Sequence, residues 1–232
     1  MPGQDAPGKR ARHQGVSGRV DIVCCVLNIH ARGFFTKGVA PLALALNRAG
    51  ITPNAITIFG TVGAVASALL CFTTGWFFTG ALLVWGFVML DLVDGVMARA
   101  ANLTTRFGGV LDSTADRVAD AAVFGALAWY FARHGVKWLL LGTLLCLVLG
   151  SLTSYIRARA EAAGLTATVG IAERAERLII ILTGTGLDGL GVPFIQAAAI
   201  WLLVAASTIT VIQRMATVYR QSKAGETTPV GP

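Results

Sequence analysis

Four aspartates lie close together in the sequence, at the end of an apolar segment. Asp91 and Asp94 are three residues apart, and Asp112 and Asp116 are four residues apart. On an α-helix, either spacing places the two carboxylates on one face, one turn apart. Because a bare carboxylate is costly to bury in apolar surroundings, four of them together require a partner that neutralises their charge.

Divalent cations are the partners that these side chains suit best. Carboxylate oxygens with no histidine or cysteine nearby favour Mg²⁺ or Mn²⁺ over zinc, and Mg²⁺ usually completes its shell with substrate phosphate oxygens. Gly95 leaves room for a ligand beside the backbone, and Arg99 offers a planar fork of donors for phosphate. Residues 104–109 add hydroxyls and a further cation. The pattern therefore predicts metal-assisted phosphate chemistry.

Spacing alone leaves two other interpretations open. Intramembrane carboxylates are also expected in transporters and proton pathways, although transporter sites usually lie near mid-membrane on broken helices. The aspartates could instead form structural ion pairs, for example Asp116 with Arg117 or Arg106. Asp120 extends the Asp116 face by one turn, and it suits a structural partner as well as a ligand.

The composition of the chain is typical of a membrane protein. Of its 232 residues, 55% are hydrophobic and 13% are charged, whereas a soluble domain carries about 25% charged residues. The mean hydropathy is +0.68. The net charge is +7, and most basic residues lie at the ends of apolar runs. This placement indicates anionic lipid headgroups as their partners and argues against nucleic acid.

Charged residues divide the chain into apolar segments of membrane-spanning length. There are 42 uncharged residues between Arg48 and Asp91, 19 between Lys137 and Arg157, and 25 between Asp188 and Arg214, and one crossing needs about 20 residues. The expected helices cover roughly 53–73, 76–99 and 108–133, a fourth lies between Lys137 and Arg157, a fifth starts near 172, and a sixth lies within 189–213. The expected fold is all-α, a polytopic membrane protein with six transmembrane helices.

The parts of the chain outside these helices suggest the domain boundaries. Residues 1–32 are expected to form an N-terminal cytoplasmic arm, partly disordered because its beginning is polar and rich in glycine. Residues 33–50 are apolar but interrupted by two basic residues and a proline, which predicts an N-terminal interfacial amphipathic helix; a short solvent-facing helix is the alternative. The membrane domain would then cover 33–221, and residues 222–232 would be a disordered tail.

The lysines and arginines predict the orientation of the chain in the cell membrane. With six crossings, the N-terminal arm, the C-terminal tail and the loops next to the aspartates share one side, and only Arg133 and Lys137 fall on the other. Because basic segments remain in the cytoplasm, a multi-pass protein with both termini and the aspartates facing the cytoplasm is expected.

The aspartate segment resembles the signature of a known family. With its spacing, it reads Asp91-x2-Asp94-Gly95-x2-Ala98-Arg99-x8-Gly108-x3-Asp112-x3-Asp116. This pattern is similar to that of the CDP-alcohol phosphotransferases, in which an alcohol attacks a CDP-linked lipid and CMP leaves. The resemblance implies that the four aspartates bind divalent metal, usually Mg²⁺ and here expected as two ions, that Asp116 is the general base, and that the protein is a homodimer.

The same resemblance assigns the contacts to the nucleotide lipid. Residues 52–57, "TPNAIT", stand at the start of the first expected crossing and resemble the CDP-contacting segment of the family. The residues that the resemblance implies as contacts of CDP-diacylglycerol are Asn54, Ala55, Ile56, Thr57, Gly95, Arg99 and Thr105.

Three other segments bear on the acceptor alcohol. Residues 154–165, 173–184 and 209–214 resemble the bacterial branch of the family that uses inositol 3-phosphate. Arg157, Arg177 and Arg214 come from three helix ends on the side of the aspartates, and three guanidiniums suit a phosphate dianion better than a neutral alcohol. Arginines that snorkel to lipid headgroups are the alternative. The family branch that uses glycerol 3-phosphate also remains open, because that acceptor carries a phosphate as well.

Overall fold

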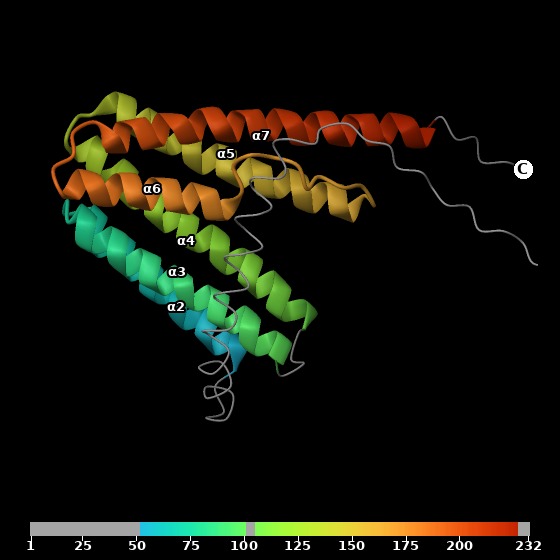
Figure 1. The fold of residues 1–232 in the computed structure, drawn as a ribbon, viewed down its shortest axis with the longest axis horizontal. Helices are drawn as coiled ribbons and strands as arrows, with labels where there is room; N and C mark the ends of the chain where they lie inside the picture. Colours follow the sequence, from blue (N-terminus) through green and yellow to red (C-terminus); the bar gives the residue numbers. More distant parts are fainter. Residues whose placement is uncertain (1–51, 101–104, 227–232) are drawn as a thin grey trace, which may run out of the picture.

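The computed structural model of the protein describes residues 52–100 and 105–226, with the backbone alone for 91–96, 98–100 and 225–226. The expected arm (1–32) and the expected interfacial helix (33–50) both lie outside the described residues. All regular structure within the described residues is helical, as expected. The elements are α2 (Pro53–Ser67), the π-helical segment η1 (Ala68–Phe72), α3 (Phe77–Ala100), α4 (Arg106–Arg133), α5 (Lys137–Ala162), α6 (Arg174–Gly189) and α7 (Ile195–Glu226) (Figure 1).

Two capping threonines set the starts of the helices that carry candidate site residues. Pro53 is the first residue of α2, and the hydroxyl of Thr52 accepts a hydrogen bond from the backbone N–H of Ala55 at 3.3 Å. Thr105 caps α4 in the same way, because its Oγ1 accepts from the N–H of Gly108 at 2.9 Å. Each hydroxyl satisfies one of the amides that a helix start leaves without an intrahelical partner.

The end of α7 differs from the sequence prediction. The helix continues to Glu226, so residues 222–226, which we expected in a disordered tail, are helical. No proline or glycine interrupts the chain between Arg214 and Ala224. In addition, the side chain of Gln221 is hydrogen-bonded to Thr166: its Oε1 accepts from the Thr166 N–H at 2.9 Å, and its Nε2 donates to the Thr166 carbonyl at 2.7 Å. The extension is thus anchored to the segment between α5 and α6.

Successive helices run in opposite directions, which divides the molecule into two ends. The short connections 73–76, 134–136 and 190–194 lie together at one end, the turn end, and Figure 1 shows α2, α3 and α4 spreading away from α5 and α7 toward the other. This second end, the open end, holds the starts of α2, α4 and α6 and the ends of α3, α5 and α7. Every segment that the sequence analysis singled out for chemistry therefore reaches the open end.

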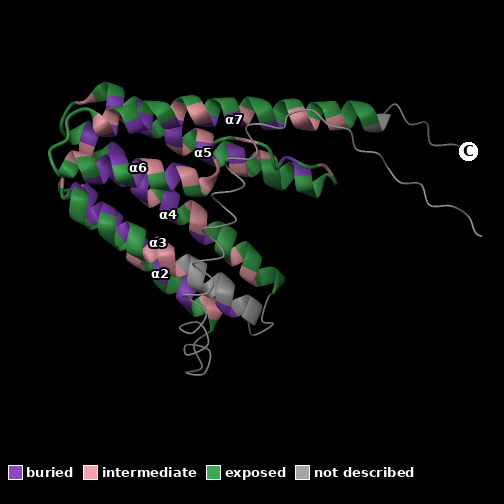
Figure 2. Cartoon of the chain, in the orientation of Figure 1, coloured by how far each residue is buried: buried purple, intermediate pink, exposed green. Residues whose placement is uncertain are grey.

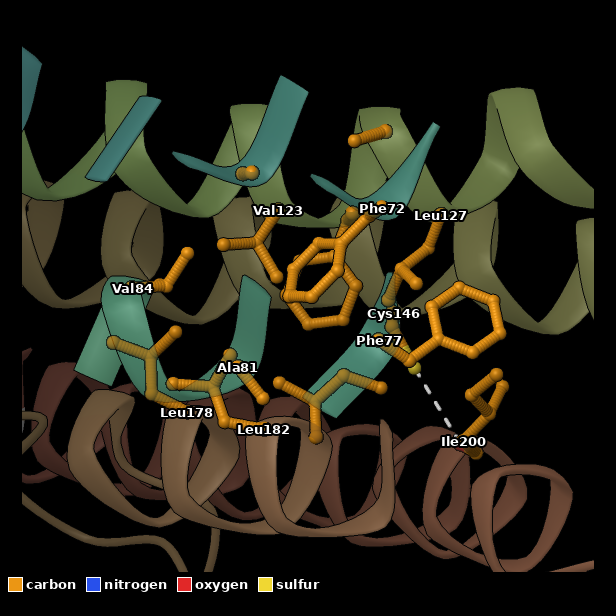
Figure 3. Close-up of a cluster of buried hydrophobic side chains, with 14 of the residues drawn as sticks. Phe72, Phe77, Ala81, Val84, Val123, Leu127, Cys146, Leu178, Leu182 and Ile200 are labelled. Atoms are coloured by element: carbon orange, nitrogen blue, oxygen red, sulfur yellow. Dashed lines mark hydrogen bonds between the residues drawn. The ribbon is translucent and has the colours of Figure 1, made fainter. Parts of the chain in front are cut away.

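The hydrophobic core lies nearer the turn end. Its buried side chains come from η1 and all helices except α2, and they include Phe72, Val84, Leu127, Leu182 and Ile200 (Figure 3). Large apolar side chains also cover much of the outer surface, where Figure 2 shows mostly exposed residues. This arrangement fits an apolar surrounding, because a soluble monomer rarely exposes so large a hydrophobic surface.

Three helical segments of the described chain are long and apolar enough to cross a membrane. They are Pro53–Phe72, Lys137–Ala162 and Ile195–Ala224, with 20, 26 and 30 residues. The other described helices do not combine this length with this apolar character. Helix α4 carries several charged residues in its first half, α6 has only 16 residues, and the apolar part of α3 is the shorter stretch Phe77–Leu90.

Replacing Gly184 with alanine is expected to separate α6 from α7. A Cβ added at Gly184 would lie 2.5 Å from the Cβ of Ala199, and close approach at small residues is a main source of helix association in membranes. Overpacking of this kind typically costs about 1–3 kcal/mol. The midpoint of thermal unfolding in detergent should therefore fall.

Gly86→Ala is the matched control, because a Cβ at Gly86 meets nothing within 4 Å. Alanine is the better helix former, so this variant should be neutral or more stable by about 0.5–1 kcal/mol. Equal unfolding midpoints for the two variants would contradict the tight packing of α6 on α7.

Candidate active site

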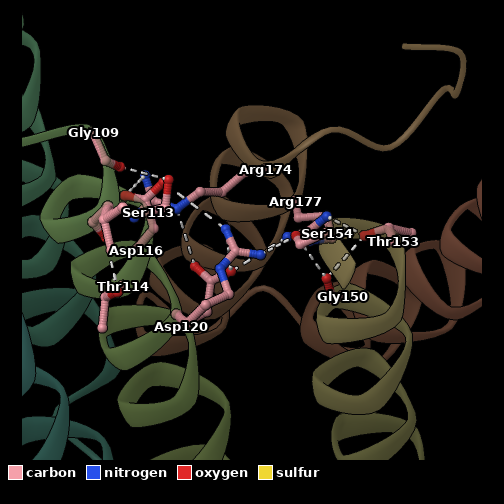
Figure 4. A network of polar contacts seen from close by, with 12 residues as sticks. Gly109, Ser113, Thr114, Asp116, Asp120, Gly150, Thr153, Ser154, Arg174 and Arg177 are labelled. Carbon is pink, nitrogen blue, oxygen red and sulfur yellow. Dashed lines mark hydrogen bonds and ion pairs between the residues drawn. The ribbon is translucent and has the colours of Figure 1, made fainter. Parts of the chain in front are cut away.

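A row of carboxylates follows one face of α4 from the open end into the molecule. Asp112, Asp116 and Asp120 are spaced by four residues, so they lie one above the other on the helix. Asp112 is exposed, whereas the side chains of Asp116 and Asp120 are 18% and 10% exposed. The row therefore passes from solvent to the interior, and its deeper members face α6 (Figure 4).

Arg174 at the start of α6 contacts both deeper aspartates. Its Nη1 lies 2.7 Å from Asp116 Oδ1, and its Nε lies 3.4 Å from Asp120 Oδ1. Arg117, on α4 itself, approaches each of the two carboxylates only to 3.9 Å. Of these described contacts, the closest ion pair of Asp116 is therefore with Arg174 on α6. The sequence had suggested Arg117 or Arg106 as its partner.

Arg177 is buried at the centre of the polar network. Its Nη2 donates to Asp120 Oδ2 at 3.3 Å, and its Nη1 donates to Thr153 Oγ1 at 3.2 Å and to the carbonyl of Ala172 at 3.3 Å. The residue is 2% exposed. Gly150 makes room for it on α5, because a Cβ there would lie 3.2 Å from the Arg177 Nε.

Arg214 on α7 is buried in the same region and holds two backbone segments. Its Nη1 donates to the carbonyl of Thr153 at 2.6 Å, and its Nε donates to the carbonyl of Val169 at 2.9 Å. Thr210, one turn earlier on α7, accepts from the N–H of Ala172 at 3.1 Å. The segment between α5 and α6 is thereby attached to α7.

Arg157 is the accessible member of the three arginines predicted to bind the acceptor. Its side chain is 46% exposed, and its Nε lies 3.0 Å from Glu161 Oε1 on the same helix. The charges of both Arg157 and Arg177 act on Arg214, so the three guanidiniums lie within electrostatic reach of one another. The structure brings the set together at the open end, with one member exposed and two buried.

The segment predicted to contact the nucleotide lipid lies beside the start of α4. A Cβ at Gly108 would be 3.1 Å from Thr105 Oγ1 and 3.4 Å from Asn54 Oδ1, so Asn54 and Thr105 adjoin one another. Thr57 and Ile56 are buried, and the Thr57 hydroxyl donates to the carbonyl of Pro53 at 3.2 Å. Ala55 is exposed.

The remaining predicted site residues lie on the last turns of α3. The backbone of Asp91, Asp94, Gly95 and Arg99 is helical, which places the two aspartates on one face, but their side chains are outside the described residues. Among the side chains that are described, no three acidic, histidine or cysteine residues form a metal-binding group. The described donor set still fits a hard divalent cation, because Asp112 and Asp116 offer only carboxylate oxygens.

Sequence reasoning missed several members of the network. Arg174 was not singled out, although Arg174 and Arg177 are three residues apart at the start of a helix and must share a face. Arg117 also donates through Nη1 to the hydroxyl of Ser154 on α5. The sequence carried no signal for this contact, because the two residues are 37 positions apart.

The family model for CDP-alcohol phosphatidyltransferases matches residues 50–219, and the chain belongs to this family. Curated relatives named phosphatidylinositol phosphate synthase include one from Mycobacteroides abscessus, 50% identical over 80% of this chain and 85% of the relative. Another, from Streptomyces avermitilis, is 43% identical over 93% of this chain and 91% of the relative. With the three apolar helices, family membership defines a helical membrane protein.

Solved structures of one relative resemble this fold closely. Mycobacterium tuberculosis phosphatidylinositol phosphate synthase with CDP-DAG bound has 48% identity and a TM-score of 0.75, covering 78% of this chain and 93% of that one. The same enzyme in complex with manganese and citrate also has 48% identity and a TM-score of 0.75, covering 78% of this chain and 88% of that one. The family resemblance read from the aspartate spacing is thereby confirmed.

Asp120→Ala is expected to destabilise the fold strongly. The substitution would leave the buried guanidinium of Arg177 without its carboxylate, and breaking a buried pair in this way typically costs about 3–5 kcal/mol. The free energy of unfolding in detergent should show this loss.

Glu161→Ala is the control, since it removes the carboxylate of an exposed pair. Such pairs contribute about 0–1 kcal/mol, so this variant should unfold near the wild-type midpoint. If Asp120→Ala were no less stable than Glu161→Ala, the pairing of Asp120 with Arg177 would make no measurable contribution to the free energy of unfolding.

Proposed function

We propose that the protein transfers the phosphatidyl group of CDP-diacylglycerol to 1D-myo-inositol 3-phosphate, which yields phosphatidylinositol phosphate and CMP. The observation that carries this proposal is the meeting of a row of carboxylates with a group of arginines at one end of the helices. Carboxylates suit metal-assisted phosphoryl chemistry, and guanidiniums suit a phosphorylated acceptor. The names of the relatives, at 43–50% identity, support the same acceptor.

The proposed metal ligands are the carboxylates of Asp91, Asp94, Asp112 and Asp116. They would hold Mg²⁺ or Mn²⁺, proposed as two ions, and a relative has been solved with manganese. A bound divalent cation would supply stabilisation for the negative charge that develops on the phosphoryl oxygens and on the leaving CMP.

Asp116 is the proposed general base. A hydroxyl is a poor nucleophile until its proton is withdrawn during attack, and a carboxylate can accept that proton. Asp116 lies between exposed Asp112 and buried Asp120. One of its carboxylate oxygens could therefore contact a cation while the other faces the acceptor. Its ion pair with Arg174, at 2.7 Å, orients the carboxylate toward α6, the helix that also carries Arg177.

The nucleotide lipid is proposed to bind at the starts of α2 and α4. Both helices present their N-termini at the open end, where the positive end of the helix dipole favours an anionic diphosphate. Asn54 and Thr105 adjoin at this point, and with them we assign Ala55, Ile56, Thr57, Gly95 and Arg99 to the CDP-diacylglycerol contacts. A relative solved with CDP-DAG bound supports this ligand.

Arg157 is the acceptor arginine that solvent and substrate can reach in this structure. Arg177 and Arg214 donate hydrogen bonds to Asp120, Thr153 and backbone carbonyls. We therefore assign these two arginines to the inner wall of the proposed acceptor site. They would supply a positive field there, while Arg157 would contact the phosphate directly.

In the membrane, we propose six crossings with the open end on the cytoplasmic side and a homodimeric state. Exposed Trp76 lies in the connection 73–76, and exposed Trp129 and Trp138 lie near the turn end of α4 and α5. This is where an interfacial aromatic belt would be expected on the opposite side of the bilayer.

The choice of acceptor is tested with purified protein, Mg²⁺ and CDP-diacylglycerol. We expect CMP release and lipid product with radiolabelled inositol 3-phosphate, and no turnover with free inositol. Arg157→Gln should raise the KM for inositol 3-phosphate by about 10- to 150-fold, the effect of one lost charge-assisted contact, and leave the KM for CDP-diacylglycerol unchanged. Arg159→Gln, an exposed neighbour on the same helix, is the matched control.

Other outcomes of that assay point to the alternatives. Turnover of glycerol 3-phosphate with none of inositol 3-phosphate would assign the chain to the other acceptor branch. Ion flux through proteoliposomes without any lipid product would favour a transporter. Equal losses toward both substrates in Arg157→Gln would give Arg157 a structural or lipid-anchoring role.

Asp116→Asn is expected to lose turnover by about 10²–10⁴-fold, the usual contribution of a general base. The amide cannot accept the acceptor proton but keeps the shape of the side chain. Titration calorimetry should find CDP-diacylglycerol and metal binding largely retained. A variant that no longer bound metal or CDP-lipid would make Asp116 chiefly a ligand, and the base would have to be another residue.

A further inference from the structure

Arg174 has no role in the function proposed above beyond orienting Asp116, yet its position is unusual. It is the first residue of α6, and its guanidinium lies between two carboxylates of α4. Nη1 is 2.7 Å from Asp116 Oδ1, and Nε is 3.4 Å from Asp120 Oδ1. The side chain is 21% exposed, so it can be reached from the open end, whereas the neighbouring Arg177 is buried.

The contact with Asp116 has a direct electrostatic consequence. A divalent cation at Asp116 would share that carboxylate with a guanidinium that already lies at ion-pair distance. Two positive groups at one carboxylate repel each other strongly where the surroundings are half-buried. The Arg174 ion pair and a cation at Asp116 therefore compete, and occupation by one weakens the other.

Asp120 allows Arg174 to leave Asp116 and still remain in the site. The Nε of Arg174 lies 3.4 Å from Asp120 Oδ1. Rotation of the whole guanidinium about the Cδ–Nε bond would carry the terminal nitrogens away from Asp116 and leave Nε at this ion-pair distance. Asp120 also pairs with Arg177, which belongs to the proposed acceptor wall. An Arg174 released from Asp116 would thus stay beside the proposed acceptor site, where its terminal nitrogens could donate to a phosphate.

A cation at Asp116 would add positive charge next to several guanidiniums. Arg117, Arg174 and Arg177 each lie within ion-pair distance of Asp116, of Asp120 or of both. A phosphate dianion beside Arg174 would offset part of the charge that the cation brings.

We propose that Arg174 couples divalent-cation binding at Asp116 to binding of the acceptor phosphate. Without a cation, its guanidinium neutralises Asp116; with a cation bound, the same guanidinium donates to the phosphate of the acceptor. This inference depends on the proposed function, because it requires Asp116 to be a metal ligand. Since coupling between two sites is reciprocal, the acceptor phosphate must in turn tighten cation binding.

The test measures Mn²⁺ binding directly, so it does not depend on catalysis. Purified full-length protein in nanodiscs is titrated with Mn²⁺, and free Mn²⁺ is followed by electron paramagnetic resonance, with and without inositol 3-phosphate. In wild type, inositol 3-phosphate should tighten Mn²⁺ binding by about 5- to 150-fold, the usual range of coupling. In Arg174→Gln, Mn²⁺ should bind more tightly than in wild type without phosphate, and the added tightening by phosphate should largely disappear.

Arg159→Gln is the matched control, because it removes an exposed arginine at the same end of the molecule. It also corrects for Mn²⁺ that inositol 3-phosphate binds in solution, and it should behave as wild type. If Arg174→Gln does not give monodisperse protein, Arg174→Lys replaces it. Lysine keeps the charge but is a single point donor that cannot span both carboxylates, so the tightening by phosphate should be weaker than in wild type.

Two results would overturn the inference in distinguishable ways. In the first, wild type and Arg159→Gln bind Mn²⁺, and Arg174→Gln or the lysine variant binds it with the same affinity as they do, with and without inositol 3-phosphate. This result would reject the role of Arg174 but leave the proposed metal site standing. No Mn²⁺ binding by wild type and control alike would reject the proposed metal site, and the coupling with it.

Discussion

The buried pairing of Arg177 with Asp120 is the constraint on which the open end of the molecule depends. A guanidinium that is 2% exposed in a helical membrane protein requires a carboxylate and further acceptors, because an unpaired buried charge is very costly. Asp120 comes from α4, Thr153 from α5 and Ala172 from the segment before α6. Satisfying one side chain therefore fixes three parts of the chain relative to each other.

The antiparallel order of the helices separates this polar end from the hydrophobic core. Because successive helices run in opposite directions, the large apolar side chains gather toward the turn end, and most charged residues of α4, α6 and α7 lie toward the other end. Helix α4 serves both ends, with Phe124 and Leu127 in the core and Asp116 in the site. Packing at one end thus holds the carboxylates in place at the other.

Local signals in the sequence predicted the helices and the carboxylate row, but not the contacts of the network. Pro53 marks the start of α2, and the spacing of Asp112 and Asp116 places them on one face, because both effects act within a few residues. The pairing of Asp120 with Arg177 joins residues 57 positions apart, and the space above Gly150 exists only after α5 and α6 have packed. The helical residues 222–226 were missed for a similar reason, since Gln221 finds its partner at Thr166, 55 positions away.

Thr153 links the two buried arginines that we propose for the acceptor site. Its hydroxyl accepts from Arg177 and its carbonyl accepts from Arg214, so two arginines from different helices are positioned by one residue of α5. A change at either arginine alters the geometry of the other, and the effects of substitutions within such a group do not add. Arg157, whose described ion pair is with Glu161 on the same exposed helix face, lies outside this shared set. We therefore propose that the acceptor site combines two buried arginines held by shared contacts with one exposed arginine, and that the buried pair contributes most to discrimination between phosphorylated alcohols.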